Sequence, residues 1–166
     1  MNHPHPPPSY PLHTLRVQAD REGLARCLAW SVTACAHLGL GNEDSHALRL
    51  AVEEACTNIV AHGYPAHAPG PLSLAIVVPE PGWVEARIGD QARPFHPDEA
   101  TEPDVQASAD ERAVGGLGWF FIKQVMTEVD YRSTPQGNCL RLRRRLTAPP
   151  TACPPADPTA PAHTAP

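Results

Sequence analysis

Glu54 and Asn58 lie four positions apart in the segment LRLAVEEACTNIVAHGYP, residues 48–65. On a helix this spacing places two side chains on one face, about 40° apart. The Asn58 amide oxygen could take one octahedral position on Mg²⁺ while phosphate and water oxygens fill the others. A carboxylate one turn earlier could orient or deprotonate an attacking hydroxyl group. The other interpretation is that these residues form the ordinary solvated face of an amphipathic helix. Glu53 lies about 140° from Asn58 and is expected to point elsewhere.

Asp90 occupies a second position that could do chemistry, in ARIGDQARPFHP, residues 86–97. The β-rich residues before it predict that a strand delivers this carboxylate to the strand's end. There it could accept a hydrogen bond from the exocyclic amine of adenine. The competing interpretation is an Asx-turn without a ligand.

Three glycines, Gly115, Gly116 and Gly118, precede a predicted helix in ERAVGGLGWFFIKQVMTEVDY, residues 111–131. Backbone N–H groups at a helix N-terminus can bind an anion such as phosphate. The spacing is not GxGxxG, and no GxxxxGK[ST] occurs in the chain. This excludes the dinucleotide-binding and P-loop signatures. A flexible loop with a helix cap remains the alternative.

Helical periodicity predicts the elements that position these groups. Asp20 is the expected N-cap of a first helix, which ends at LGLGN, and a second helix is expected over 44–61. Gly63 is expected to close the second helix in a left-handed conformation, and Pro65 prevents its continuation. A third helix is expected from Leu117 to Val125.

Alternation of apolar and polar residues predicts strands over 12–18, 72–78, 84–88, 128–133 and 138–146. Gly82 is expected in the turn of one hairpin and PQG in the turn of the other. Because hairpins dominate, the prediction is an α+β fold: a two-layer α/β sandwich with a mixed, mostly antiparallel sheet and helices on one face.

Composition predicts one folded domain, residues 12–147, between two disordered tails, 1–11 and 148–166. Of the 21 prolines, five fall in the first tail and seven in the second. The net charge of -5 argues against direct nucleic-acid binding. No apolar run approaches the ~20 residues that span a bilayer. Five cysteines without a CxxC pair favour reduced thiols and a cytoplasmic protein.

Four arginines, Arg141, Arg143, Arg144 and Arg145, crowd the last predicted strand. One interpretation is an edge strand whose charges prevent pairing with other chains. The other is a docking surface for an acidic partner.

The segments VEEACTN–HGYP, GDQARPFHP and GGLGWFFIKQVMTEVDY together resemble the anti-sigma-factor serine/threonine kinases of the RsbW and SpoIIAB kind. These belong to the wider histidine-kinase-like (GHKL) ATPases, which share the Bergerat-type ATP-binding fold. Their order and separation are similar to the family's over residues 12–146. The resemblance implies ATP and Mg²⁺ as cofactors.

The resemblance also implies roles for individual residues. Glu54 would be the catalytic base, Asn58 the magnesium ligand and Asp90 the adenine contact. The implied nucleotide-binding set further includes Ala92, Phe95, Arg112, Gly115, Gly116, Leu117 and Gly118. Ala92 stands where the family often has glycine, so its β-carbon could crowd the adenine or restrict the loop.

The function implied by the resemblance is a kinase that phosphorylates a small STAS-type anti-sigma-factor antagonist and sequesters a sigma factor, acting as a homodimer. The alternative is a non-catalytic module that binds ATP and acts through partner binding only. Glu54 favours the kinase, because a pure binder has no need of a base there, whereas Ala92 favours the binding module. A detached histidine-kinase domain is disfavoured, since the chain lacks room for a separate phosphoacceptor helix pair.

Overall fold

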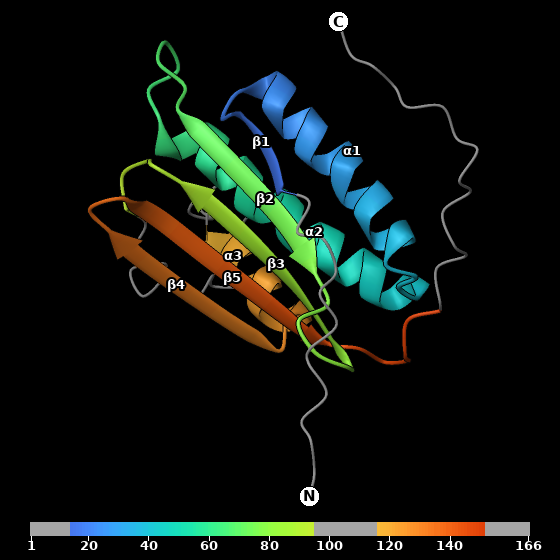
Figure 1. The fold of residues 1–166 in the computed structure, drawn as a ribbon. Coiled ribbons are helices and arrows are strands. Elements are labelled where there is room, and N and C mark those ends of the chain that lie inside the picture. Colours follow the sequence, from blue (N-terminus) through green and yellow to red (C-terminus); the bar gives the residue numbers. More distant parts are fainter. Residues whose placement is uncertain (1–13, 95–115, 152–166) are drawn as a thin grey trace, which may run out of the picture.

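The fold is a single antiparallel sheet with three helices stacked on one side (Figure 1). The structure is a computed structural model that describes residues 14–94 and 116–151. The elements are β1 (Thr14–Gln18), α1 (Arg21–His37), α2 (Asn42–Asn58), the π-helical turn η1 (Ile59–Gly63), β2 (Pro71–Val77), β3 (Trp83–Asp90), α3 (Gly116–Val125), β4 (Glu128–Thr134) and β5 (Gly137–Arg145). The strand order is β1-β2-β3-β5-β4, and every neighbouring pair is antiparallel. The expected two-layer α+β sandwich is confirmed.

The two faces of the sheet differ because side chains alternate along each strand. On the helix face, the row Leu15, Leu74, Ile88, Leu140 and Tyr131 runs across all five strands in register. The central members of this row join Leu48 and Val52 of α2 in one hydrophobic core. The opposite face, which none of the described helices covers (Figure 1), is called the outer face below.

Helix α1 begins where its cap predicts. The Asp20 side chain accepts a hydrogen bond from the Gly23 backbone N–H at 2.8 Å, as an N-cap does. The helix buries Cys27, Ser31 and Cys35, which follow one another at intervals of four. Gly39 then turns the chain with φ of 63°. The cap and the stop at LGLGN are therefore confirmed.

Helix α2 ends differently from the expectation. It stops as an α-helix at Asn58 and continues as the wider turn η1 to Gly63. Among the described residues, the glycines with positive φ are Gly39, Gly82 and Gly137. Gly63 does not have a positive φ, so the expected left-handed cap is wrong. Gly63 is needed for space instead, because a β-carbon there would lie 2.8 Å from Ala92 Cβ.

Both hairpins use a glycine that their turns require. Gly82 has φ of 81° between β2 and β3, and Gly137, the first residue of β5, has φ of 133°. Strand β5 lies between β3 and β4, so the interpretation of its arginines as guards of an edge strand is wrong. Strand order follows from long-range packing, which the alternation of residues along one strand does not encode.

A buried ion pair ties the two layers together at Asp44, in the first turn of α2. Arg144 Nε donates to Asp44 Oδ1 at 2.8 Å, and Arg144 Nη1 donates to the Val125 carbonyl at the end of α3 at 2.7 Å. The Thr147 N–H and hydroxyl donate to Asp44 Oδ2. Burial pushes the pKa of Asp44 up, but the hydrogen bonds from Arg144 and Thr147 outweigh it and hold that pKa below its usual range.

The chain after β5 folds back onto the turn between α1 and α2. Thr151 donates hydrogen bonds from its N–H and hydroxyl to the Gly39 carbonyl, at 2.9 and 3.2 Å. Four cysteines of the described residues are free: Cys27, Cys35 and Cys56 are buried, and Cys139 is exposed. Within the described ranges, the helices are too short or too polar to cross a bilayer.

Candidate functional site

Glu54 and Asn58 lie on one half-buried face of α2, as their spacing predicts. The neighbouring face, with Val52 and Ala55, packs into the core. Glu53 is exposed, so adjacent carboxylates on this helix have different surroundings. The Glu54 carboxylate and the Asn58 amide are thus held at the border between core and solvent, where a ligand can reach them.

Gly118 brings the start of α3 against these two side chains. A β-carbon at Gly118 would collide with Glu54 Oε2 and lie 3.7 Å from Asn58 Nδ2. A side chain at position 118 would therefore push the Glu54 carboxylate out of its place. The helix begins at Gly116, so Gly116, Leu117 and Gly118 form its first turn instead of a loop before it. Backbone N–H groups in a first turn have no partner within the helix.

Asp90 is the last residue of β3 and points to the helix face, where its strand neighbours are Leu72 and Asn138. Asp90 Oδ1 accepts hydrogen bonds from the Ala92 N–H at 2.8 Å and from Asn138 Nδ2 at 2.7 Å. Within residues 14–94 and 116–151, Oδ2 makes no hydrogen bond or ion pair. The carboxylate is therefore fixed through one oxygen, with the other available to a donor.

The Asx-turn that was the alternative interpretation of Asp90 is present, since the Asp90 side chain accepts from the N–H two residues on. The turn does not compete with ligand binding, because it uses Oδ1 alone. Asn138 is 6% exposed and also donates to the Ala92 carbonyl at 3.0 Å, which fixes the start of the loop after β3.

The Ala92 methyl group packs against Gly63. It occupies the space that a side chain at Gly63 would need. The Arg93 N–H donates to the Gly63 carbonyl at 3.4 Å, which joins the same two segments. The β-carbon at Ala92 thus has a place against η1.

Tyr64 fastens the loop that carries Ala92. Its hydroxyl accepts from the Gln91 N–H at 2.6 Å and donates to the Pro71 carbonyl at 2.8 Å. Burial raises the pKa of Tyr64, so the hydroxyl stays protonated and keeps its donor role. The tyrosine ring lies over Gly70, where a β-carbon would collide with it. One side chain therefore ties η1, β2 and the end of β3 together.

The structure brings most of the predicted residues into two adjoining groups. The first group is Glu54, Asn58 and Gly118, and the second is Asp90 with Ala92. The turn η1 connects the two groups, because it starts right after Asn58 and touches Ala92 at Gly63. Phe95, Arg112 and Gly115 lie outside the described residues. Two residues that hold the site were missed from the sequence, Asn138 and Tyr64. Tyr64 lies in the HGYP segment read only as a helix end, and Asn138 follows a turn glycine without any distinguishing pattern.

These oxygens do not form a closed metal site. No group of three His, Cys, Asp or Glu side chains within residues 14–94 and 116–151 is arranged to hold a metal ion. Asn58 and Glu54 could supply three oxygens at most, whereas Mg²⁺ prefers six. The donor set fits a cation whose remaining positions are filled by ligand and water oxygens, as in a magnesium–nucleotide complex.

The comparisons with known proteins agree with this arrangement. The histidine kinase-like ATPase domain family matches residues 17–144. The anti-sigma F factor of Priestia megaterium is 32% identical over 103 residues, which cover 60% of this chain and 69% of the relative. The serine-protein kinase RsbW of Bacillus velezensis is 29% identical over 125 residues, or 72% and 76% of the two chains.

A solved structure shares the fold. The crystal structure of the RsbU and RsbW domains of a Mycobacterium tuberculosis protein superposes with a TM-score of 0.58 at 18% identity. The match covers 81% of this chain and 32% of that one, so this chain spans about a third of the two-domain structure. Together with the family match over nearly the whole described fold, these relationships show that the chain belongs to the histidine kinase-like ATPase family, in the group similar to the anti-sigma-factor kinases of the RsbW kind.

Proposed function

We propose that this protein is an ATP-dependent serine/threonine kinase that phosphorylates a small STAS-type anti-sigma-factor antagonist and sequesters a sigma factor in the cytoplasm, as a homodimer. The names of its relatives, an anti-sigma F factor and a serine-protein kinase, support the class of activity. The observation that carries the proposal is the contact of Gly118 with the Glu54 carboxylate beside Asn58. It sets a possible base and a possible metal ligand directly against the first turn of α3.

The residues present fit a magnesium–ATP complex. Asn58 would supply one oxygen to the cation, and the first-turn N–H groups of α3 at Gly116, Leu117 and Gly118 would bind phosphate oxygens. Asp90 would accept the adenine amine on Oδ2, since Asn138 and the Ala92 N–H already hold Oδ1. When bound, ATP would supply the phosphoryl group for transfer.

The proposed role of Glu54 is to orient the hydroxyl of the protein substrate and to accept its proton on a carboxylate oxygen. Asn138 and Tyr64 would act as positioning residues, because they hold the Asp90 carboxylate and the Gln91–Arg93 loop through hydrogen bonds. We include Phe95, Arg112 and Gly115 in the nucleotide-binding set on the resemblance alone.

Glu54 and Glu53 provide the test, because they are adjacent but differ in exposure. Glu54→Gln should lower phosphotransfer from labelled ATP to a purified antagonist protein by roughly 10²–10⁴, the usual range for loss of a general base. Nucleotide affinity should stay within a few-fold, since a base acts mainly in the transition state. Glu53→Gln is the control and should leave both unchanged.

The alternative function, a non-catalytic ATP-binding module, predicts a different result. The wild-type protein would bind ATP yet transfer no phosphate to any antagonist, and Glu54→Gln would match Glu53→Gln in every assay. Asn58→Ala separates the two roles further, because loss of a magnesium ligand should weaken Mg–ATP binding itself.

A further inference from the structure

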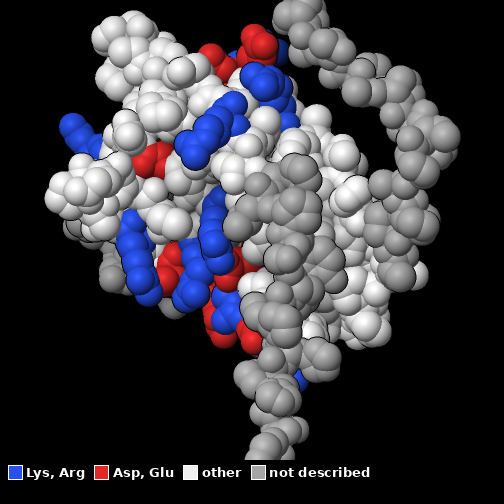
Figure 2. Space-filling view, in the orientation of Figure 1, with Lys and Arg blue, Asp and Glu red and all other residues white. Residues whose placement is uncertain are grey.

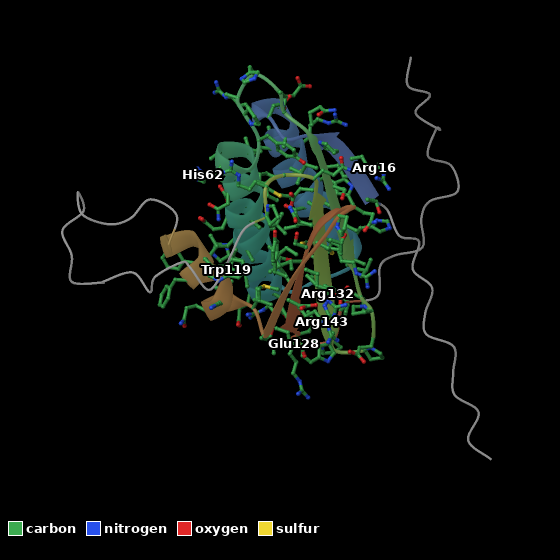
Figure 3. The ribbon with its side chains drawn as sticks, turned by 90° about the vertical axis from the view of Figure 1, so that its left-hand side faces the viewer. Arg16, His62, Trp119, Glu128, Arg132 and Arg143 are labelled. Atoms are coloured by element: carbon green, nitrogen blue, oxygen red, sulfur yellow. The ribbon has the colours of Figure 1, made fainter. Side chains whose placement is uncertain are left out.

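The outer face of the sheet carries a concentration of arginine that the proposed kinase site does not use. Figure 2 looks onto this face and shows blue side chains with red ones between them. The edge-on view of Figure 3 places Arg16, Arg132 and Arg143 on the opposite side of the sheet from Trp119 of α3. Strand register assigns six arginines to this face: Arg16, Arg87, Arg132, Arg141, Arg143 and Arg145.

Four carboxylates neutralise part of this charge. Arg143 contacts Glu80, lies 2.7 Å from Glu128 Oε2 and lies 3.4 Å from Glu85 Oε2. Glu85 also pairs with Arg87. Asp130 is shared by two arginines of neighbouring strands, Arg132 at 3.1 Å and Arg141 at 3.4 Å.

Two arginines of the outer face remain without an ion pair among residues 14–94 and 116–151. They are Arg16 on β1 and Arg145 at the end of β5, and both are exposed. The face therefore holds six guanidinium groups against four carboxylates, in a chain whose net charge is -5. A positive surface on an acidic protein attracts partners of opposite charge.

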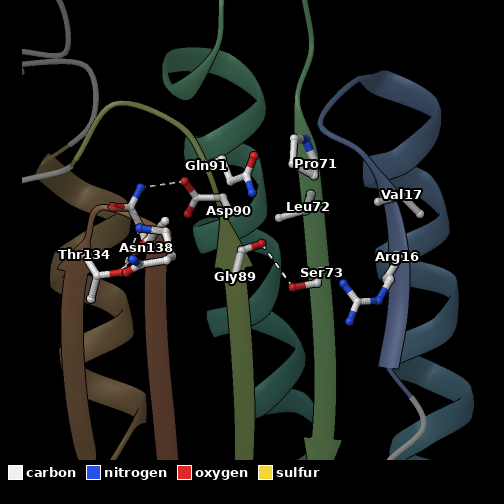
Figure 4. A pocket seen from close by; sticks show the side chains of 12 residues that line it. Arg16, Val17, Pro71, Leu72, Ser73, Gly89, Asp90, Gln91, Thr134 and Asn138 are labelled. Atoms are coloured by element: carbon white, nitrogen blue, oxygen red, sulfur yellow. Dashed lines mark hydrogen bonds between the residues drawn. The ribbon is translucent and has the colours of Figure 1, made fainter.

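A hollow of about 320 Å³ lies beside Arg16 at one end of the outer face. The Arg16 side chain points across it toward Ser73 (Figure 4). Around it stand the polar groups of Asp90, Gln91, Thr134, Gln136 and Asn138. A guanidinium group next to amide and hydroxyl groups suits a carboxylate, which can accept two parallel hydrogen bonds from arginine. Glu54 and Asn58 do not line this hollow, whereas Asp90 and Asn138 do, so the hollow adjoins the adenine end of the candidate site and not its catalytic end.

We propose that the outer face is a docking surface for an acidic segment of a partner protein, with one carboxylate of that segment bound to Arg16 in the hollow. The mixture of charges favours a protein over a nucleic acid. A duplex presents a negative charge every ~1.7 Å of its axis, and the outer-face carboxylates Glu128 and Asp130 would repel such a surface. An acidic protein segment with spaced carboxylates can meet the arginines and avoid these acids.

The proposal goes beyond the kinase function and does not depend on it. Glu54, Asn58 and Gly118 do not line the hollow, so a partner on the outer face leaves the catalytic end of the nucleotide site open. Substitution of Arg16 and Arg145 changes none of Glu54, Asn58 and Asp90, so loss of partner binding can be measured apart from loss of phosphotransfer.

Titration of the full-length ¹⁵N-labelled protein with a synthetic peptide of alternating Glu and Ser tests the proposal. The chemical-shift changes should map to the backbone amides of outer-face residues in β1, β3 and β5. The affinity for the peptide should fall with added salt. The variant carrying Arg16→Glu and Arg145→Glu should bind at least about tenfold more weakly, and a variant with Gln at both positions should show an intermediate loss. Arg21→Glu, the same charge change in the first turn of α1, is the matched control and should bind like the wild type.

Three outcomes would overturn the proposal. Shifts confined to α1 and α2 would place the acidic segment on the helix face. Equal losses of peptide affinity in Arg21→Glu and in the outer-face variant would show non-specific electrostatic attraction without a defined binding site. Tighter binding of a duplex oligonucleotide than of the peptide, lost in the outer-face variant, would assign the surface to nucleic acid instead. Failure of phosphotransfer alone would refute the kinase proposal and leave this one standing.

Discussion

Strand β5 presents two kinds of arginine on its two faces. Arg144 faces the helices, where it joins Asp44, Glu43 and the end of α3. Its neighbour Arg145 is exposed and makes no ion pair within the described part of the chain. The same residue type thus serves as a buried tie between layers at one position and as an exposed charge at the next.

The difference shows that the alternation of side chains along a strand gives the two faces of the sheet different roles. The helix face is committed to stability and to the candidate nucleotide site, because buried polar groups such as Asp44 and Asn138 are hydrogen-bonded to specific partners there. The outer face is a set of charges, several of them exposed, whose ion pairs contribute little individually. Substitutions on the helix face should therefore have larger effects than the same substitutions on the outer face.

The largest effect is expected for Arg144→Met against Arg145→Met. The first change leaves the Asp44 carboxylate buried without its charged partner, which should cost about 3–5 kcal/mol of unfolding free energy. The second removes an exposed charge and should cost less than about 0.5 kcal/mol. Urea denaturation followed by circular dichroism measures both, and equal losses would contradict the division between the faces.

The same pair predicts an acid dependence of stability. The pKa of Asp44 is lowered in the folded protein, so the pair contributes stability fully above the unfolded value of about 3.9. This contribution is lost as the pH falls through the folded pKa. The stability difference between wild type and Asp44→Asn should therefore shrink in denaturation curves recorded from pH 6 downward. A difference that is constant with pH would mean that the ion pair is not the cause.

Asp90→Asn should weaken ATP binding by roughly 1–3 kcal/mol, because an amide can present a donor to the adenine amine. Asp130→Asn makes the same change on the outer face and should leave ATP affinity unchanged. Titration calorimetry compares the two variants. An Asp90→Asn protein that binds ATP like the wild type would remove Asp90 from the proposed adenine site.

A smaller effect is expected from Tyr64→Phe, which removes the hydrogen bonds to Gln91 and Pro71. A loss of about 1 kcal/mol is usual for such bonds. If Tyr64 positions the Gln91–Arg93 loop, ATP affinity should fall several-fold while phosphotransfer at saturating ATP stays near the wild-type rate. Tyr131→Phe on β4 is the matched control. Equal affinities for the two variants would restrict Tyr64 to a structural role.

The smallest effect concerns the two ends of the chain. We predict that deletion of residues 1–11 and 152–166 leaves the melting temperature almost unchanged, because both are rich in proline and poor in large apolar side chains. A deletion that starts at 148 also removes the Thr151 bonds to Gly39 and should cost up to about 1 kcal/mol. A fall of more than about 5 °C for the shorter deletion would show that a tail packs on the body.

Much of the fold could be predicted from the sequence because its signals are local. The Asp20 cap, the intervals of three and four in α1 and α2, the alternation in the strands and the turn glycines Gly82 and Gly137 each act within a few residues. The spacing of Glu54 and Asn58 likewise fixed their common face. The three motifs, in their order, indicated the family before any contact was known.

Tertiary structure alone decided which distant residues meet. The Asn138–Asp90 bond joins residues 48 positions apart, and Arg144–Asp44 joins residues 100 apart. Such pairs depend on strand order, and the placement of β5 between β3 and β4 turned a predicted edge strand into an interior one. Periodicity along one segment carries no information about its neighbours. For the same reason, the number of arginines in β5 is evident from the sequence, but their roles are not. Only the tertiary structure distinguishes the arginine that ties the layers together from those on the outer face.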